Sequence, residues 1–526
     1  MTAQFAQQAK DRGLALVQQG RLADARLEFQ KAVQLQPDDT DARNNLAVVL
    51  IHLQRYGEAA LHFQQVLRTR PELVEAHIGL GVCLQRELKR DEAVACYRQA
   101  LQLAPGHVKA QNNLGVALME MNRLEEAATS FEQAVKAKPD HVDSHVNLGI
   151  VRMKQGRLDE SAACYRKALD LAPNLVDALG GLGAVLTIQG HLSEAMIYFE
   201  QALRLNPHHA DAHLNRAVIL LLQGQWEKGW VEYEWRWRTK TFAAHALPQP
   251  RWDGSELAGR TILLQAEQGL GDTLHFIRYA PLVKERGGKV ILQCEPSLVR
   301  LLTGVQGIDS LVTRGSPIPP FDVYAPLVSL AGIFHTTPTT IPATIPYLHG
   351  NAQLVSQWRG ELSSVKGLKV GIAWHGSPSH AANHFRSFPL AKFAPLAKIK
   401  GVQLISLQKG PGAEQLAALG TQFSVQDLGY RLDATAGPFM DTAAVMKNLD
   451  LVIACDTATA HLAGALGVPV WVALSVTPDW RWLLERADTP WYPTMRLFRQ
   501  KRLGDWDDVF QQMTTQLQSL AQSHAK

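Results

Sequence analysis

Long hydrophobic runs, a secretory leader and an excess of charge of one sign are all missing from this sequence of 526 residues. The longest apolar runs, such as Ala217 to Leu222, are far too short to cross a bilayer. The first residues contain no apolar stretch of the kind that a secretory signal needs. The net charge is only +4 and no polybasic tract stands out, so nucleic acid is not an implied partner. We therefore expect a cytoplasmic protein with no membrane span.

Cysteine is also scarce. Five cysteines occur, an odd number, and no two of them form a C-x-x-C pair. Neither a disulfide framework nor a structural zinc site is therefore expected. The chain is nonetheless too long for a single hydrophobic core, which predicts at least two domains.

The first half of the chain is strictly periodic. Small residues follow each of six prolines at the fifth and tenth positions, and an aromatic residue precedes each proline by eight. The prolines recur at steps of 34 residues, at Pro37, Pro71, Pro105, Pro139, Pro173 and Pro207. Small residues let two antiparallel helices approach closely, the aromatic ring fills the space between neighbouring repeats, and proline ends the second helix.

This pattern resembles the tetratricopeptide repeat, whose period is also 34 residues. The resemblance covers residues 4–241, as six full repeats and an altered seventh, and it implies an α-helical solenoid. The seventh repeat contains four tryptophans, Trp226, Trp230, Trp235 and Trp237, and Trp252 follows it. Such a composition suits a capping repeat that hides its apolar end. We also expect the next domain to cover this end and make a stiff joint.

A second column of the repeats carries amides. Eight residues after the prolines, four of six positions hold asparagine: Asn45, Asn113, Asn147 and Asn215. The first helix of each pair lines the concave surface of such a superhelix, so asparagines there can hold the backbone of an extended peptide acceptor. The repeat domain of the eukaryotic O-GlcNAc transferase is similar in this respect. The alternative is that these asparagines stabilise the repeats, whereas peptide binding predicts unpaired amides in the free protein.

The second half alternates short β-rich runs with helical stretches. One set of runs lies at 261–265, 289–293, 308–312 and 321–325, and another at 369–374, 402–407, 451–455 and 470–474. Two such sets predict two Rossmann-like lobes with a cleft between them. We expect an N-terminal lobe at 242–350 and a C-terminal lobe at 351–526. This α/β arrangement resembles the GT-B fold of glycosyltransferases, although other two-lobed folds share it.

The first motif of this part is a Gly-rich turn between a strand and a helix start, LLQAEQGLGDTLH at residues 263–275. It resembles the G-D motif near the N-terminus of bacterial heptosyltransferases. The resemblance implies that Asp272 faces the cleft as the base that deprotonates the acceptor hydroxyl, with His275 one turn along as the reserve base. The alternative is that Asp272 caps the helix, where the helix dipole makes a carboxylate a weaker base.

The second motif, at residues 451–470, is another strand, turn and helix, LVIACDTATAHLAGALGVPV. Free amides at the helix start and the threonine hydroxyls suit a diphosphate. Heptosyltransferases have a similar D-[ST]-x-x-x-H-L-A segment that holds the donor diphosphate. The resemblance therefore implies a nucleotide-sugar site formed by Asp456, Thr457, Ala458, Thr459, Ala460 and His461. A capped helix with a core histidine is the alternative.

Two further loops add candidate donor-binding residues. Arg386 lies where heptosyltransferases place a lysine near the donor phosphates, and an arginine neutralises charge on a leaving diphosphate. Gln408 and Lys409 follow another strand, where O-GlcNAc transferase has a similarly placed lysine. For Arg386 the alternative is a solvated surface side chain.

No D-x-D strand end, P-loop or nucleophile elbow occurs, and no metal site is expected. Together the patterns predict a bacterial-type GT-B glycosyltransferase, inverting and metal-independent, with a nucleotide sugar as co-substrate and no further cofactor. Its acceptor would be a protein or peptide held by the repeat groove. Heptosyltransferases lack a solenoid, which disfavours a lipopolysaccharide acceptor. The alternative is a scaffold whose α/β part is inactive or senses a ligand.

Overall fold

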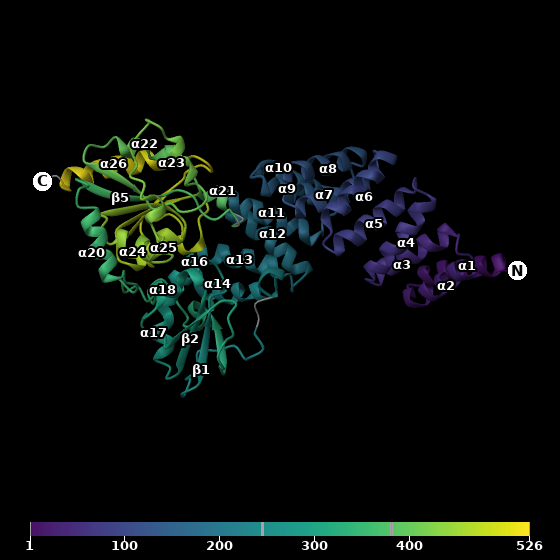
Figure 1. Cartoon of the computed structure of the whole chain (residues 1–526), viewed down its shortest axis with the longest axis horizontal. Helices are drawn as coiled ribbons and strands as arrows, with labels where there is room; N and C mark the ends of the chain where they lie inside the picture. Colours follow the sequence, from purple (N-terminus) through teal and green to yellow (C-terminus); the bar gives the residue numbers. More distant parts are fainter. Residues whose placement is uncertain (1, 244–246, 379, 381, 525–526) are drawn as a thin grey trace. The chain divides into compact units, whose positions relative to one another are not determined.

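The computed structural model describes residues 2–243, 247–378, 380 and 382–524. Within these residues, the first part of the chain consists of consecutive antiparallel helix pairs (Figure 1). The pairs are α1 Thr2–Gln18 and α2 Leu22–Leu35, α3 Thr40–His52 and α4 Tyr56–Thr69, α5 Val74–Arg86 and α6 Arg90–Leu103, α7 Val108–Glu120 and α8 Leu124–Ala137, α9 Val142–Lys154 and α10 Leu158–Leu171, α11 Val176–Gln189 and α12 Leu192–Leu205, and α13 Ala210–Leu222 and α14 Trp226–Tyr233.

The regular spacing of proline and aromatic residues along the repeats has the predicted structural effect. The second helix of each of the first six pairs ends two residues before a proline, as α2 does before Pro37. The aromatic column is buried throughout, with Tyr165 2% exposed and the other five side chains 0% exposed. A Cβ at Gly81 would lie 2.6 Å from the Tyr97 ring of the same repeat. Because carbon atoms overlap at this distance, glycine lets the ring pack directly against the helix backbone.

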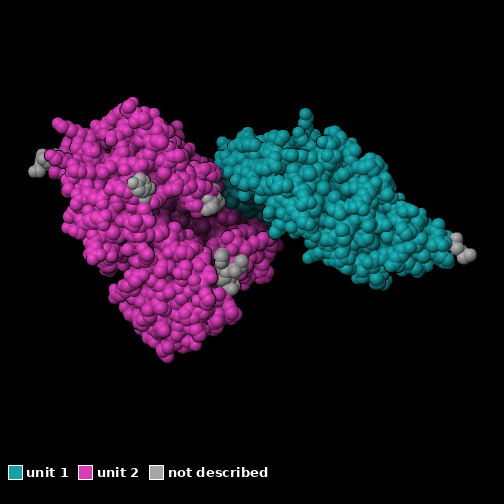
Figure 2. Space-filling model, in the orientation of Figure 1, with its two compact units in different colours: residues 1–185 teal, residues 186–526 magenta. Residues whose placement is uncertain are grey.

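Two compact units divide between residues 185 and 186, and Figure 2 colours them separately. The division lies inside α11, so the last repeats belong to the same unit as the α/β part. We call residues 1–185 unit 1 and residues 186–526 unit 2. The expected boundary at residue 241 marks the end of the repeat pattern, whereas the compact units are set by packing.

The tryptophan-rich seventh pair explains this packing. Trp226 stacks on Trp491 with 5.3 Å between ring centroids, and Trp230 meets Trp480 edge-on at 5.1 Å. The Trp230 indole N–H also donates a hydrogen bond to the Thr336 carbonyl at 2.8 Å. The seventh pair therefore packs against both halves of the α/β part, which cover its apolar end as the sequence predicts.

Two parallel sheets form the core of the α/β part. The first has the strand order β3-β2-β1-β4 and the second the order β6-β5-β7-β8-β9. The strands are β1 Thr261–Gln265, β2 Lys289–Cys294, β3 Ser310–Thr313, β4 Val323–Pro326, β5 Leu368–Ala373, β6 Val402–Ser406, β7 Leu451–Cys455, β8 Val470–Leu474 and β9 Met495–Arg499. The first eight lie within two residues of their predicted ranges, and β9 was not predicted.

Helices cover both faces of the second sheet (Figure 1). Val370 and Ile372 of β5 share an apolar core with Phe510 and Met513 of α26, whereas α25 contacts β7 and β8 from the other face. The α-helices of this part are α15 Lys240–Ala243, α16 Leu270–Phe276, α17 Ala280–Lys284, α18 Val299–Leu302, α19 Ser329–Ile333, α20 Ala352–Glu361, α21 Asn383–Arg386, α22 Ala394–Ala397, α23 Glu414–Ala418, α24 Met440–Met446, α25 Ala458–Ala465 and α26 Trp506–His524. Among the helices of the described residues, none combines the length and apolar content that a membrane crossing requires.

Candidate functional site

A cavity of about 850 Å³ lies between the two sheets, lined by residues that directly follow β1, β5, β6 and β7. Parallel strands end at the same edge of a sheet, which explains why motifs far apart in the sequence converge here. Of the residues assigned to catalysis or donor binding, nine line this cavity: Asp272, Arg386, Gln408, Lys409, Asp456, Thr457, Ala458, Thr459 and His461. His275 and Ala460 are buried behind its wall, each 0% exposed.

The starts of two helices meet in this cavity. The Gly-rich turn after β1 leads into α16, and the turn after β7 leads into α25. A Cβ at Gly271 would lie 3.0 Å from the His461 ring and 3.6 Å from the Ala458 backbone. Glycine at this position therefore allows the first turn to lie directly against the start of α25.

Asp272 is held at the start of α16 by two partners. Its Oδ2 accepts a hydrogen bond from the Gly269 N–H at 2.9 Å, and its Oδ1 accepts one from the Arg481 guanidinium. Asp272 therefore caps the start of α16 from the third helical position, whereas the N-cap residue itself is Gly269. The side chain is 22% exposed and lines the cavity. Since a carboxylate has about four acceptor positions, capping leaves room for a proton from a bound hydroxyl.

The start of α25 has the properties of an anion site. Thr457 occupies the N-cap position, but its side chain makes no capping hydrogen bond among the described residues. Its hydroxyl instead lies 3.4 Å from the Cys455 carbonyl oxygen. The first amides of the helix are thus left without a side-chain acceptor, and Ala458 and Thr459 line the cavity. Such amides, at the positive end of the helix dipole, favour a phosphate group.

Arg386 adds a cation to the same wall. Within the described part of the chain it forms no ion pair, and its buried Nε has no hydrogen-bond partner. A Cβ at Gly376 would lie 3.2 Å from the Arg386 Nη2, so the guanidinium packs closely over this backbone. The half-buried position differs from the solvated surface position that was the alternative. A guanidinium in this setting suits two parallel hydrogen bonds to a diphosphate.

Asp456 and His461 line the cavity and are both buried. Burial raises the pKa of Asp456 to about 6, with Asp479 acting in the same direction and Arg386 opposing it. Burial, together with neighbouring arginines, holds the pKa of His461 well below its usual range, so this imidazole is neutral at pH 7. The His461 Nδ1 lies 3.0 Å from the Tyr492 hydroxyl. A carboxyl that titrates near neutral pH inside a cavity is typical of functional sites.

The expectation that His275 is a reserve base is not supported by its position. The imidazole is sealed from solvent, and its Nδ1 lies 3.0 Å from the Tyr492 hydroxyl. Burial, with a smaller effect of Arg278 and Arg481, lowers its pKa well below the usual range. A general base must reach the proton that it removes. Because His275 and His461 share the Tyr492 hydroxyl, His275 instead helps to fix the orientation of His461.

Gln408 and Lys409 both line the cavity, but they differ in how many hydrogen bonds they make to the protein. The Gln408 Oε1 accepts hydrogen bonds from the backbone N–H groups of Trp374 and His375, both at 3.0 Å, and its Nε2 donates to the His375 carbonyl at 3.0 Å. The amide therefore joins two loops of the wall and is not offered to a ligand. Lys409 is exposed at the rim, where its Nζ donates to the Leu432 carbonyl.

Several residues of the wall had no role assigned from the sequence, among them Arg481, Asp479 and Phe439. Arg481 is 5% exposed on its side chain and pairs with Asp272 and with Asp479, 2.8 Å away. Phe439 lines the cavity with φ of +64°, a conformation that is strained for a bulky residue. A ring held in this way at a cavity wall suits stacking on a nucleotide base. The strain is a property of the folded loop and leaves no signal in the local sequence.

The asparagine column lies on the first helices of the repeats and is half-buried at Asn45, Asn113, Asn147 and Asn215. In unit 1 successive first helices, such as α7 and α9, contact each other. The expectation of unpaired amides is wrong for Asn147. Its Nδ2 donates a hydrogen bond to the Asn112 Oδ1 of the neighbouring repeat at 3.0 Å. Asn45, Asn113 and Asn215 form no side-chain hydrogen bond within the described residues. The column therefore combines a structural contact with open amides.

Metal ligands do not gather in the described residues, where no three His, Cys, Asp or Glu side chains are arranged to hold an ion. The five cysteines are free thiols, three buried and two half-buried. The cavity beside the start of α25 is lined by three cationic side chains of the described residues, Arg386, Lys409 and Arg481.

Comparisons with known proteins concern mainly the repeats. Tetratricopeptide-repeat models match residues 10–74, 80–142, 117–176, 146–203 and 186–229. The chain is also similar to protein FlbA of Caulobacter vibrioides, with 27% identity over 322 residues, 56% of this chain and 53% of FlbA. It thus spans about half the length of this curated relative.

Solved structures similar to the chain include tetratricopeptide repeat proteins. A tetratricopeptide repeat protein from Parabacteroides merdae has 17% identity and a TM-score of 0.39, over 44% of this chain and 91% of that one. PilF of Pseudomonas aeruginosa has 19% identity and a TM-score of 0.37, over 41% of this chain and 98% of that one. From the family models, residues 10–229 contain tetratricopeptide repeats, and an α/β part with two parallel sheets follows them.

Proposed function

We propose that this chain is a metal-independent glycosyltransferase of the GT-B type that moves a sugar from a nucleotide-sugar donor to a polypeptide. The observation that carries the proposal is the cavity between the two parallel sheets, where an acidic residue at one helix start faces an anion site at another. Nucleotides commonly bind outside the carboxyl ends of parallel strands in α/β folds. The cytoplasm is the compartment in which we place this activity.

Each wall residue has a role in the proposed reaction. The amides at the start of α25 and the Arg386 guanidinium bind the diphosphate, and Phe439 stacks on the base. Asp272 accepts the proton of the acceptor hydroxyl while the hydroxyl oxygen attacks the anomeric carbon of the donor sugar. The bond from that carbon to the diphosphate breaks, and the nucleoside diphosphate leaves with the bonding electrons. Attack opposite the leaving group inverts the anomeric centre.

A second candidate function is that of a scaffold or adaptor, which the tetratricopeptide repeats favour. In that case the α/β part binds a nucleotide without transferring a sugar. The two candidates differ in donor turnover. Incubation of the full chain with a panel of nucleotide sugars, followed by measurement of nucleoside diphosphate release, distinguishes them.

A nucleoside diphosphate is expected to bind the full chain in the presence of EDTA, because protein groups compensate its charge. Calorimetric titration with UDP, ADP and GDP measures this binding. Thr457→Trp is expected to weaken it about tenfold or more, since the larger side chain blocks two charge-assisted hydrogen bonds to helix amides. Thr515→Trp, on the exposed face of α26, is the matched control. Binding that EDTA abolishes, or that Thr457→Trp leaves unchanged, would contradict the site assignment.

The open asparagines are expected to act on acceptor use alone. Asn45, Asn113 and Asn215 changed together to alanine should raise the KM for a polypeptide acceptor about tenfold or more, because each lost hydrogen bond is worth about 0.5–1.5 kcal/mol. Donor hydrolysis and the melting temperature should be unchanged.

Asn147→Ala provides the control from within the same column. Its bond to Asn112 joins two repeats, so its loss should lower the melting temperature without a selective effect on the acceptor. A triple variant that loses stability and keeps its acceptor KM would show that the whole column is structural.

A further inference from the structure

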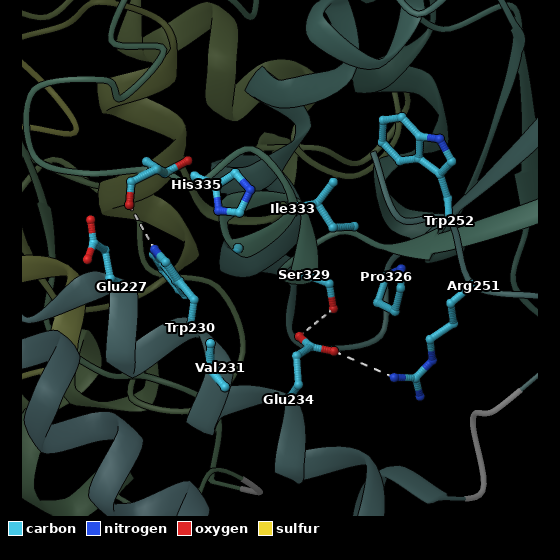
Figure 3. A pocket seen from close by; sticks show the side chains of 12 residues that line it. Glu227, Trp230, Val231, Glu234, Arg251, Trp252, Pro326, Ser329, Ile333 and His335 are labelled. Carbon is cyan, nitrogen blue, oxygen red and sulfur yellow. Dashed lines mark hydrogen bonds and ion pairs between the residues drawn. The ribbon is translucent and has the colours of Figure 1, made fainter. Parts of the chain in front are cut away.

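A second cavity, of about 570 Å³, lies between the last repeat and the first lobe of unit 2 (Figure 3). Trp230 and Val231 of α14 form one wall, and Trp252, Pro326 and Ile333 of the first lobe form the opposite wall. None of the residues that line the cavity beside α25 belongs to it. Five apolar side chains facing one another make an environment suited to another apolar group.

Both indole N–H groups and the serine hydroxyl that line this second cavity are already hydrogen-bonded within the protein. The indole N–H of Trp230 donates to the Thr336 carbonyl at 2.8 Å, and that of Trp252 donates to the Ser255 carbonyl at 2.8 Å. The Ser329 hydroxyl donates to the Glu234 carboxylate at 2.7 Å. A sugar or a nucleotide needs donors and acceptors that its site leaves open. The cavity therefore favours an apolar occupant over a polar one.

The rim of the second cavity carries two glutamates on the side of the repeats, and one of them is unpaired in the described residues. Glu227 and Glu234 lie seven residues apart, two helical turns, at the same edge. Glu234 is partnered, with Arg251 3.5 Å away and a hydrogen bond from Arg236 at 2.6 Å. Glu227 is exposed and has no ion pair in the described residues. An open carboxylate beside an apolar cavity complements a cation that is attached to an apolar group.

Val231 strengthens this interpretation. It lies on α14 between the two glutamates in sequence and is 70% exposed, although it borders the cavity. A partner that covers this aliphatic side chain together with the cavity gains stability from the apolar area that it buries. Both features of the site, an uncovered apolar rim and a lone carboxylate, belong to the last repeat. The partner therefore approaches along the surface of the repeats.

We propose that this cavity is a second anchor for the acceptor polypeptide and takes an apolar side chain that is followed closely by Lys or Arg. The inference rests on the proposed function for the identity of the occupant as an acceptor. The apolar side chain fills the space between the two tryptophans, and the basic side chain pairs with Glu227. The anchor selects acceptors by sequence, whereas amides of the repeats hold a backbone regardless of sequence.

Selection of randomised nine-residue peptides displayed on phage against the full chain tests the anchor without any donor sugar. The expected result is enrichment of peptides with an apolar residue one or two positions before Lys or Arg. For a synthetic copy of an enriched peptide, Glu227→Lys and Val231→Arg should each weaken binding about tenfold or more, as loss of a charged pair or of a covered aliphatic group would. Both positions are exposed, so the fold should persist. Glu125→Lys, an exposed glutamate of α8, is the matched control.

Each outcome decides between the anchor and its alternatives. Absence of this enrichment, or enriched peptides that bind the Glu227→Lys variant as well as the wild type, would overturn the anchor. A change of mass in light scattering caused by Val231→Arg, without competition by peptides, would assign the surface to a second copy of the chain and would also overturn it. Enriched peptides that bind at Glu227 but receive no sugar from any nucleotide-sugar donor would leave the anchor in place and contradict the proposed function.

Discussion

Replacement of Asp272 by asparagine is expected to depress sugar transfer by about 10²-fold or more and to leave nucleoside diphosphate affinity nearly unchanged. Asparagine keeps an oxygen for the Gly269 N–H, so the cap of α16 survives. Arg481 keeps Asp479 as a partner at 2.8 Å, so no unpaired buried cation results. What the variant loses is an acceptor for the hydroxyl proton. The kcat for donor turnover with acceptor, together with calorimetric affinity, measures the two effects separately.

Asp488→Asn is the control for this variant, because Asp488 forms a surface ion pair with Arg486 at 2.7 Å and does not line the cavity. It should transfer at the wild-type rate. An Asp272→Asn variant that also transfers at that rate would leave Asp272 as a cap and a partner of Arg481. A variant that instead loses its nucleotide affinity would place Asp272 in the donor site.

Most strands, and most of the residues assigned to the cavity, were predictable from the sequence for the same reason. Buried parallel strands appear as unbroken apolar runs, as in Leu451–Cys455, where every residue is buried. The candidate site residues then follow the strands directly, as Asp456 follows β7. Strand β9 was missed because Met495–Arg499 is an edge strand in which Arg496 interrupts the apolar run.

The remainder of the site depends on contacts between distant segments. Arg481 reaches Asp272 from a loop after β8, and no spacing within that loop indicates the pairing. The burial of His275 has the same origin, since Tyr492 and Trp491 cover it from the second lobe. A histidine one turn after an acidic residue gives no sign of whether it faces a cavity or a core. The last repeats belong to the unit of the α/β part, against which Trp226 stacks on Trp491, and the end of the repeat pattern gives no sign of this.

The last repeat is joined by an ion pair to the segment that leads into the turn of Asp272. Loss of this pair in Arg236→Met is expected to lower the free energy of unfolding of unit 2 by about 3–5 kcal/mol. Arg236, in the 3₁₀ helix Glu234–Arg238, is 0% exposed and donates to Glu267 at 3.1 Å and to Ser329 at 2.7 Å. The Glu267 side chain is also 0% exposed, and it directly precedes the Gly-rich turn. Methionine fills much of the space of arginine but leaves Glu267 as a buried charge without a partner. The double variant Arg236→Met/Glu267→Gln should recover most of the loss.

The stability deficit of Arg236→Met should depend on pH. Burial raises the pKa of Glu267, and Arg236 opposes that rise, so the variant has an even higher folded-state pKa. Because this folded pKa exceeds the unfolded value of about 4.3, the stability is present at low pH and is lost as pH rises through the folded pKa. The deficit relative to wild type should therefore grow as pH rises above the unfolded value.

Tryptophan fluorescence during urea unfolding measures this deficit in unit 2 alone, since all 12 tryptophans lie at residue 226 or beyond. Arg238→Met, an exposed arginine of the same short helix, is the control and should change stability by about 0.5 kcal/mol or less. A double variant as unstable as the single one would show that lost packing of Arg236, and not the uncompensated Glu267, causes the effect. With the pair intact, the final repeat fixes the backbone from which Asp272 projects. Donor turnover should therefore fall in folded Arg236→Met protein even when no polypeptide acceptor is present.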